Sequence, residues 1–180
     1  MVRCSRATHG KGLSPMLPPP RTYAVWLAVI RIYTGIFWLS HGIPKLLNPQ
    51  FFGASGMMAG MLHEATGHGH GPYNDFLIHV VLPNAGVFSH LVAWGETLTG
   101  VSLLLGLFTR AGGVVGVFLP LNYFMMKGSY GDITAIGSLD IAAAALSFIH
   151  VVLPTGLIAG LDAVLPGSRA TRPVAGERGH

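Results

Sequence analysis

The chain has 180 residues, and it carries too little charge for an ordinary soluble domain. Hydrophobic residues make up 51% of it and charged residues only 10%, whereas charged residues form about 25% of a typical soluble domain. The mean hydropathy is +0.54, and the formal net charge is +4. This composition predicts an integral membrane protein. Most of the basic residues lie near the two ends, so the positive charge relates to membrane topology, and we expect no nucleic-acid partner.

The single cysteine, Cys4, limits the chemistry that the chain can perform by itself. Dithiol exchange, attachment of a c-type haem through CxxCH, and a cysteine-ligated iron–sulfur cluster all need more thiols than this chain has. These three classes of redox centre are therefore excluded within the chain.

The order of apolar and polar segments predicts an all-α membrane protein: a four-transmembrane-helix bundle with a long outer loop that carries short interfacial helices. Residues 1–21 are basic and rich in proline and glycine, which is typical of a disordered cytoplasmic tail. Residues 22–161 form the membrane domain, and residues 162–180 form a second flexible basic tail. Each span needs about 20 apolar residues to cross the hydrocarbon core. The four predicted spans are residues 22–44, 87–108, 111–126 and 136–161.

The distribution of basic residues predicts the orientation, because cytoplasmic segments of membrane proteins carry an excess of lysine and arginine. Eight basic residues fall on one side of the four-span arrangement, namely Arg3, Arg6, Lys11, Arg21, Arg110, Arg169, Arg172 and Arg178. Only Lys45 and Lys127 fall on the other. We therefore expect an integral protein of a bacterial or archaeal cytoplasmic membrane, surrounded by lipid bilayer, with both termini in the cytoplasm.

The segment 45–86 is the predicted extracytoplasmic loop. It contains two apolar stretches, FFGASGMMAGML and NDFLIHVVL, separated by the glycine-rich GHGHG. Neither stretch is long enough to span a bilayer. We expect each to form a short helix that lies at the outer interface or covers the mouth of the bundle as a lid.

Arg31 and Glu96 are the most informative residues, since each lies near the centre of a predicted span. A charged side chain at that depth costs about 2.5–3.5 kcal/mol on insertion scales and usually marks a functional site. Two opposite charges at matched depth predict a midplane ion pair, which could also be purely structural and fix the register of two helices. With His150 they are the candidate catalytic residues. His150 has three interpretations: a hydrogen-bonded core residue, a proton relay to Glu96, or a metal or haem ligand.

Polar residues in the outer half of the predicted bundle suggest a pocket that opens outward. A pocket with apolar walls and few polar groups suits a small amphipathic ligand. Tyr123 is expected in this outer half, and the candidate cofactor-binding residues are His41, Lys45, Trp38, Asn122 and Asp140.

Metal binding is not favoured by the sequence. Methionines and histidines of the outer loop could bind copper, but their irregular spacing favours ordinary packing of flexible thioethers. A haem held by His41 and His90 is not favoured either. We expect no metal ligands.

Two longer stretches resemble a known family. RIYTGIFWLSHGIPKL is similar to the first-span pattern of DoxX/DoxD-like membrane proteins, and LVAWGETLTGVSLLLGLFTR to their second-span pattern. The resemblance covers about residues 25–160 and implies a four-helix membrane bundle associated with redox chemistry, since DoxD-like subunits belong to a thiosulfate:quinone oxidoreductase. The positions that match the family's pattern are Arg31, Gly42, Lys45, Glu96, Gly100 and Arg110.

The leading hypothesis is therefore a quinone-interacting membrane subunit of an oxidoreductase system, with quinone as the cofactor and with electrons taken from a substrate or a redox partner protein. In this hypothesis Glu96 exchanges the proton that accompanies quinone chemistry, Arg31 tunes its ionisation and His150 relays. The rival hypothesis is a non-catalytic membrane anchor or small-solute transport module that docks an extracytoplasmic partner. Bound quinone in a purified sample would favour the first hypothesis.

Overall fold

The computed structural model describes residues 20–68, 70–128 and 133–164. The two predicted tails lie almost wholly outside the described residues. The described segments form helices and turns, with no strand among them, so the all-α prediction is confirmed for this part of the chain.

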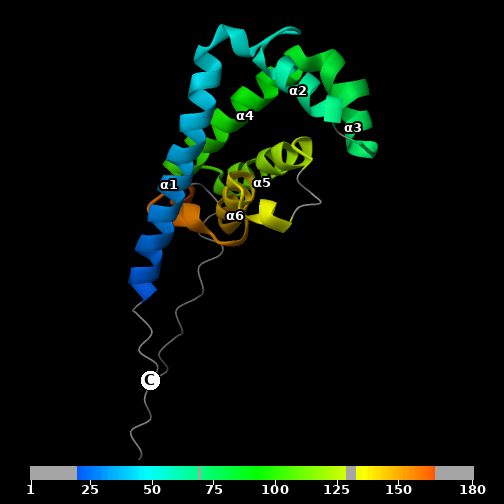
Figure 1. The fold of residues 1–180 in the computed structure, drawn as a ribbon. Helices are drawn as coiled ribbons and strands as arrows, with labels where there is room; N and C mark the ends of the chain where they lie inside the picture. The colour runs from blue at the N-terminus through cyan, green and yellow to red at the C-terminus, as the bar shows by residue number, and fades with distance from the viewer. Residues whose placement is uncertain (1–19, 69, 129–132, 165–180) are drawn as a thin grey trace, which may run out of the picture.

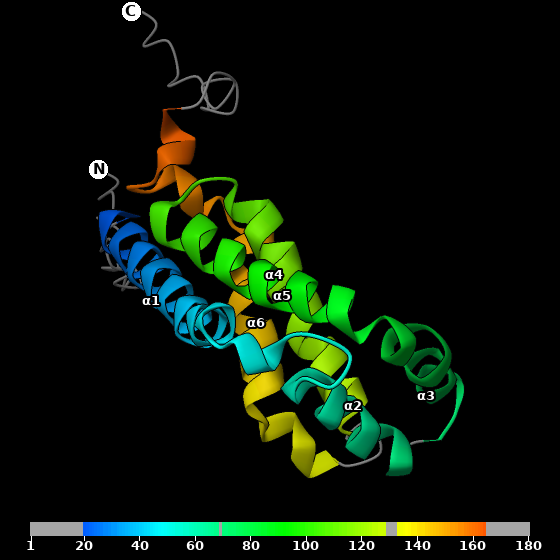
Figure 2. The same ribbon diagram turned by 90° about the horizontal axis from the view of Figure 1, so that it is seen from above.

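Four longer helices lie side by side, as Figure 2 shows. They are α1 (Pro20–Leu47), α4 (Ala85–Leu105), α5 (Thr109–Met126) and α6 (Leu139–Val152). α1 packs mainly on α4, and α5 packs mainly on α6. Glycine permits the closest contact, because a Cβ on Gly35 would lie only 2.6 Å from the backbone nitrogen of Leu104. Small residues at helix interfaces are typical of membrane helices.

Two helical segments are long and apolar enough to cross a membrane by length and composition, Tyr23–Leu47 and Pro72–Leu105. The second begins earlier than the sequence predicts. It contains α3 (Pro72–Phe76), a π-helical turn η2 (Leu77–Val81) and a 3₁₀ turn η3 (Leu82–Asn84) before α4. The apolar stretch NDFLIHVVL thus leads directly into α4 instead of forming a separate interfacial helix.

The predicted fourth span, 136–161, needs correction. Its α-helix α6 covers only Leu139–Val152, and 14 residues rise about 21 Å, less than the roughly 30 Å hydrocarbon core. Pro154 comes two positions after the last residue of α6, and a proline inside a helix removes a backbone hydrogen bond. The chain continues as the 3₁₀ turns η6 (Thr155–Leu157) and η7 (Leu161–Ala163). A further 3₁₀ segment, η5 (Ile133–Gly137), precedes α6.

The two ends of the helix group are covered differently. At the end where α1 finishes, which we call the outer end, lie η1 (Pro49–Phe51), α2 (Met57–His68) and α3 (Figure 1). Buried side chains of α2, η2 and the start of α4 form a small apolar core there. At the opposite, inner end, η6 and η7 fold back against the turn between α4 and α5.

Candidate functional site

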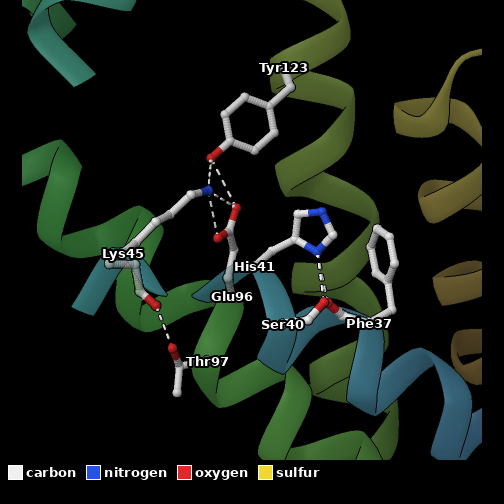
Figure 3. A network of polar contacts seen from close by, with 8 residues as sticks. Phe37, Ser40, His41, Lys45, Glu96, Thr97 and Tyr123 are labelled. Atoms are coloured by element: carbon white, nitrogen blue, oxygen red, sulfur yellow. Dashed lines mark hydrogen bonds and ion pairs between the residues drawn. The ribbon is translucent and has the colours of Figure 1, made fainter. Parts of the chain in front are cut away.

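An ammonium, a carboxylate and a phenol meet near the outer end, each from a different helix (Figure 3). The Lys45 Nζ of α1 donates to both carboxylate oxygens of Glu96 on α4, at 2.6 Å each. It also donates to the Tyr123 hydroxyl of α5 at 2.9 Å, and that hydroxyl donates to Glu96 Oε1 at 3.0 Å. We call these three residues the outer polar cluster. It joins a proton donor, a proton acceptor and an ionic partner in one closed network.

Within the outer polar cluster, the carboxylate is buried and the ammonium is partly exposed. The side chain of Glu96 is 2% exposed, whereas that of Lys45 is 23% exposed. The aromatic rings of Phe51 and Tyr123 lie beside the ammonium, with centroids at 5.6 and 5.1 Å. A buried carboxylate needs such partners, because removing an isolated charge from water costs several kcal/mol.

Close approach of two helices places Lys45 against Glu96. A Cβ at Gly42 would lie 2.6 Å from the backbone nitrogen of Thr97, so only glycine permits this spacing of α1 and α4. Lys45 lies three positions after Gly42, and Glu96 lies one position before Thr97. The cluster therefore depends on a contact that larger side chains would open.

Arg31 lies at the inner end and has other partners. Its Nη1 donates to the carbonyl oxygen of Thr155 and its Nη2 to that of Ala159, both at 3.0 Å. The residue is 1% exposed, and its Nε has no hydrogen-bond partner among the described residues. Arg31 thus fastens the segment that follows α6 to α1.

The predicted midplane pair of Arg31 and Glu96 is therefore corrected. Among the described residues, no hydrogen bond or ion pair joins the two. Glu96 lies level with Lys45, and the fourteen positions from Arg31 to Lys45 on α1 correspond to about 21 Å of helical rise. Depth within a predicted span does not fix the register of two helices, and the antiparallel packing that places Gly42 against Thr97 decides which side chains meet.

His150 also belongs to the inner end. Its Nε2 lies 3.3 Å from Thr34 Oγ1, and its Nδ1 lies 3.1 Å from Thr155 Oγ1. The Thr34 hydroxyl donates to the Ile30 carbonyl, so its oxygen accepts from the imidazole Nε2–H, and the Thr155 hydroxyl donates to Nδ1. His150 is 0% exposed. His150 is therefore a hydrogen-bonded core histidine. It shares Thr155 with Arg31 as a partner, and among the described residues no hydrogen bond joins it to Glu96.

Two predicted cofactor-binding residues of α1 have hydrogen-bond partners outside the outer polar cluster. The indole Nε1–H of Trp38 donates to Ser147 Oγ of α6 at 3.1 Å, and the ring is buried. His41 is exposed, and its Nδ1 lies 2.8 Å from the carbonyl oxygen of Phe37 within the same helix. Of the predicted set on α1, the structure places only Lys45 in the outer polar cluster.

A cavity of about 360 Å³ lies between α2, α3 and the end of α5. We call it the outer cavity. Its wall includes the thioethers of Met61, Met125 and Met126, and its polar lining residues include Glu64, His70, Tyr73, Asn74 and Lys127. Its volume lies within the range of about 300–1,000 Å³ that is usual for small-molecule sites. The thioethers give a flexible apolar surface.

Asn122 and Asp140, the other predicted cofactor-binding residues, contact lining residues of this cavity. The Tyr73 hydroxyl donates to both the backbone and side-chain oxygens of Asn122, at 3.2 Å each. Lys127 Nζ forms an ion pair with Asp140 Oδ2 at 2.7 Å. Both residues therefore support the cavity wall from behind.

The outer cavity and the outer polar cluster share one face of α5. Tyr123 precedes Met126 by three positions and Lys127 by four, and residues at these spacings lie one above the other on a helix. The phenol therefore belongs to the helical stripe that continues into the cavity wall.

Sequence reasoning missed two residues. Tyr73 lies in the segment expected to be interfacial, where nothing in the pattern marks a contact with α5. Asp162 falls in the predicted tail, yet its carboxylate accepts from the backbone N–H groups of Phe108 and Thr109, at 2.7 and 3.1 Å, and from the Thr109 hydroxyl at 2.7 Å. It therefore caps the start of α5, a role that an N-cap residue usually fills from within its own helix.

No group of three or more histidine, cysteine or acidic side chains that could hold a metal ion occurs within residues 20–68, 70–128 and 133–164. Large apolar side chains, by contrast, cover outward-facing surfaces of all four longer helices, for example Trp26, Trp94, Phe118 and Phe148. Exposed apolar area on this scale marks an interaction surface, and a bilayer provides one.

Comparison with known proteins gives one result. The family model described as DoxX matches residues 26–126, which is more than half of the chain and includes the outer polar cluster. No match was found among curated proteins or among solved structures.

Proposed function

Since this chain belongs to the DoxX family, we propose that it is a quinone-interacting membrane subunit of a redox system. The observation that carries the proposal is the outer cavity, whose volume of about 360 Å³ and methionine-rich wall suit an aromatic head group. The isoprenoid tail would lie in the bilayer against the exposed apolar side chains of the four longer helices.

The outer polar cluster would serve the protons of quinone chemistry. Reduction of a quinone to a hydroquinone takes up two electrons and two protons, and the electrons would come from a substrate or a partner protein. Glu96 would accept or deliver a proton, with Tyr123 as the hydroxyl nearest the cavity on α5 and Lys45 as its ionic partner. This assignment replaces Arg31 and His150, which lie at the inner end.

We also propose the membrane orientation that the basic residues predict. The outer end, with α2 and α3, would face away from the cytoplasm, and both termini would lie on the cytoplasmic side of a bacterial or archaeal cytoplasmic membrane. α5 and α6 would complete the four-helix membrane domain, with α6 and the turns after it reaching only part of the way across.

One observation favours the rival function, a non-catalytic anchor or solute-transport module. The three protons of the Lys45 ammonium are matched by its three acceptors, two on Glu96 and one on Tyr123. A fully satisfied network of this kind also suits a purely structural contact between α1, α4 and α5.

Organic extraction of the purified protein tests the proposal. We expect bound quinone in wild type and a loss of most of it in Met61→Trp, because the indole would fill part of the outer cavity. Met57→Trp is the matched control, since Met57 is another exposed methionine of α2, 54% against 46% for Met61, and is not part of the cavity lining. Absence of quinone from wild type would contradict quinone binding. If both variants retained the same amount of quinone, this would contradict the placement of the quinone site in the outer cavity.

A further inference from the structure

The hydrogen-bonding groups of the outer cavity distinguish the two redox forms of its proposed ligand. A quinone ring carries carbonyl acceptors only, whereas a hydroquinone carries two hydroxyl donors as well. A site therefore selects between them by the number of acceptors that it leaves without a donor. This inference rests on the proposed function and concerns the same site.

Asn74 supplies the decisive group. It lines the cavity, and its Oδ1 is a buried acceptor with no hydrogen-bond partner among the described residues. Buried side-chain acceptors are normally satisfied, so an unpaired one calls for an explanation, and a ligand that donates to it is one such explanation. The amide belongs to α3, and directly after it comes the π-helical turn η2, whose first residue Leu77 also lines the cavity. Single π-helical turns are frequent at functional sites.

Two neighbouring groups of the cavity lining, Tyr73 and Glu64, can also accept hydrogen bonds. The Tyr73 O–H already donates to Asn122, so the hydroxyl oxygen can only accept a further hydrogen bond. When it is ionised, the Glu64 carboxylate at the cavity wall accepts hydrogen bonds and cannot donate them. The Lys127 ammonium is a donor, but one of its N–H groups already donates to Asp140 Oδ2, and its side chain is 54% exposed.

We propose that the outer cavity binds the hydroquinone form in preference to the quinone, with one ligand hydroxyl donating to Asn74 Oδ1. A bound quinone leaves this acceptor unpaired, whereas a hydroquinone satisfies it by a small rotation of the amide. The Met61, Met125 and Met126 thioethers contact the ring in either redox form and therefore do not contribute to the preference.

Equilibrium dialysis of the purified full chain under argon tests this preference, with protein-free micelles as the blank. The probes are decylubiquinol and decylubiquinone. We expect wild type to bind the quinol on the order of fivefold more tightly, the ratio that one recovered hydrogen bond gives. In Asn74→Leu the ratio should fall to about one. Asn84→Leu is the control, because Asn84 is an exposed amide outside the cavity lining, and it should keep the wild-type ratio.

A third probe keeps the test decisive if Asn74→Leu does not fold. The bis-methyl ether of decylubiquinol has the same ring and tail but no donor, and wild type should bind it no more tightly than the quinone. Equal binding of all three probes would overturn the preference while leaving quinone binding intact. Tighter binding of the quinone would show that Asn74 presents its N–H to the ligand. Absence of binding by every probe would overturn both this inference and the proposed function.

Discussion

The ion pair between Lys45 and Glu96 gives a prediction whose magnitude follows from burial. Glu96 is 2% exposed and accepts three hydrogen bonds, two of them from Lys45. Lys45→Met would leave a buried carboxylate without its counter-charge, which typically costs about 3–5 kcal/mol of stability. Glu96→Leu would remove the charge and leave a partly exposed ammonium that can turn to solvent, so its cost should be smaller.

The double variant Lys45→Met/Glu96→Leu should recover much of the loss, because replacing both partners of a buried pair by apolar side chains is often close to neutral. The assay is reversible unfolding in detergent micelles, followed by circular dichroism. We expect a coupling energy well above the roughly 0.5 kcal/mol by which independent sites deviate from additivity.

Two controls within the chain sharpen this experiment. The cycle Arg31→Met with Glu96→Leu should be additive, since the helical rise that separates Arg31 from the level of Glu96 is about 21 Å. Lys127→Met should cost at most about 1 kcal/mol, because the Lys127 side chain is 54% exposed in its pair with Asp140. Strong coupling of Arg31 to Glu96, with additive losses for Lys45 and Glu96, would refute the partner assignment.

Three further predictions follow from the packing and the topology. Gly42→Ala should separate α1 from α4 and lower the unfolding temperature, since its Cβ would meet the Thr97 backbone, whereas Gly60→Ala, with nothing within 4 Å of its Cβ, should not. Asp162→Ala should destabilise the protein by about 0.5–2 kcal/mol, the usual cost of a lost helix cap, measured by the same unfolding assay; an unchanged stability would show that the cap is dispensable. Reporter fusions at both termini should indicate cytoplasm and an insertion between α2 and α3 the outer side; an external signal from either terminus would contradict the topology.

The helices were predictable because their signals are local. Apolar runs of about 20 residues identify membrane helices without knowledge of their neighbours, and α1, α4 and α5 begin and end within a few residues of the expected positions. The end of α6 was not predicted correctly. The predicted span was extended through Pro154 and two glycines because the segment is apolar.

The partners of the charged residues depend on register, which hydropathy does not encode. Depth counting placed Arg31 and Glu96 at the same level, whereas the glycine contact at Gly42 aligns Glu96 with Lys45. Lys45 was expected to be a cofactor-binding residue, and the structure gives it Glu96 and Tyr123 as partners. The acceptors of Arg31 are backbone carbonyls. Every residue has a backbone carbonyl, so residue identity does not reveal which of them accept from Arg31.

Photo-crosslinking with an azido-quinone tests the central claim most directly. The account predicts labelled peptides from α2 around Met61 and from the end of α5 around Met125 and Met126, the thioethers that line the outer cavity. Excess decylubiquinone should suppress this labelling. Labelling confined to lipid-facing surfaces such as that of Trp26 on α1, and insensitive to competitor, would contradict a quinone site at the outer end.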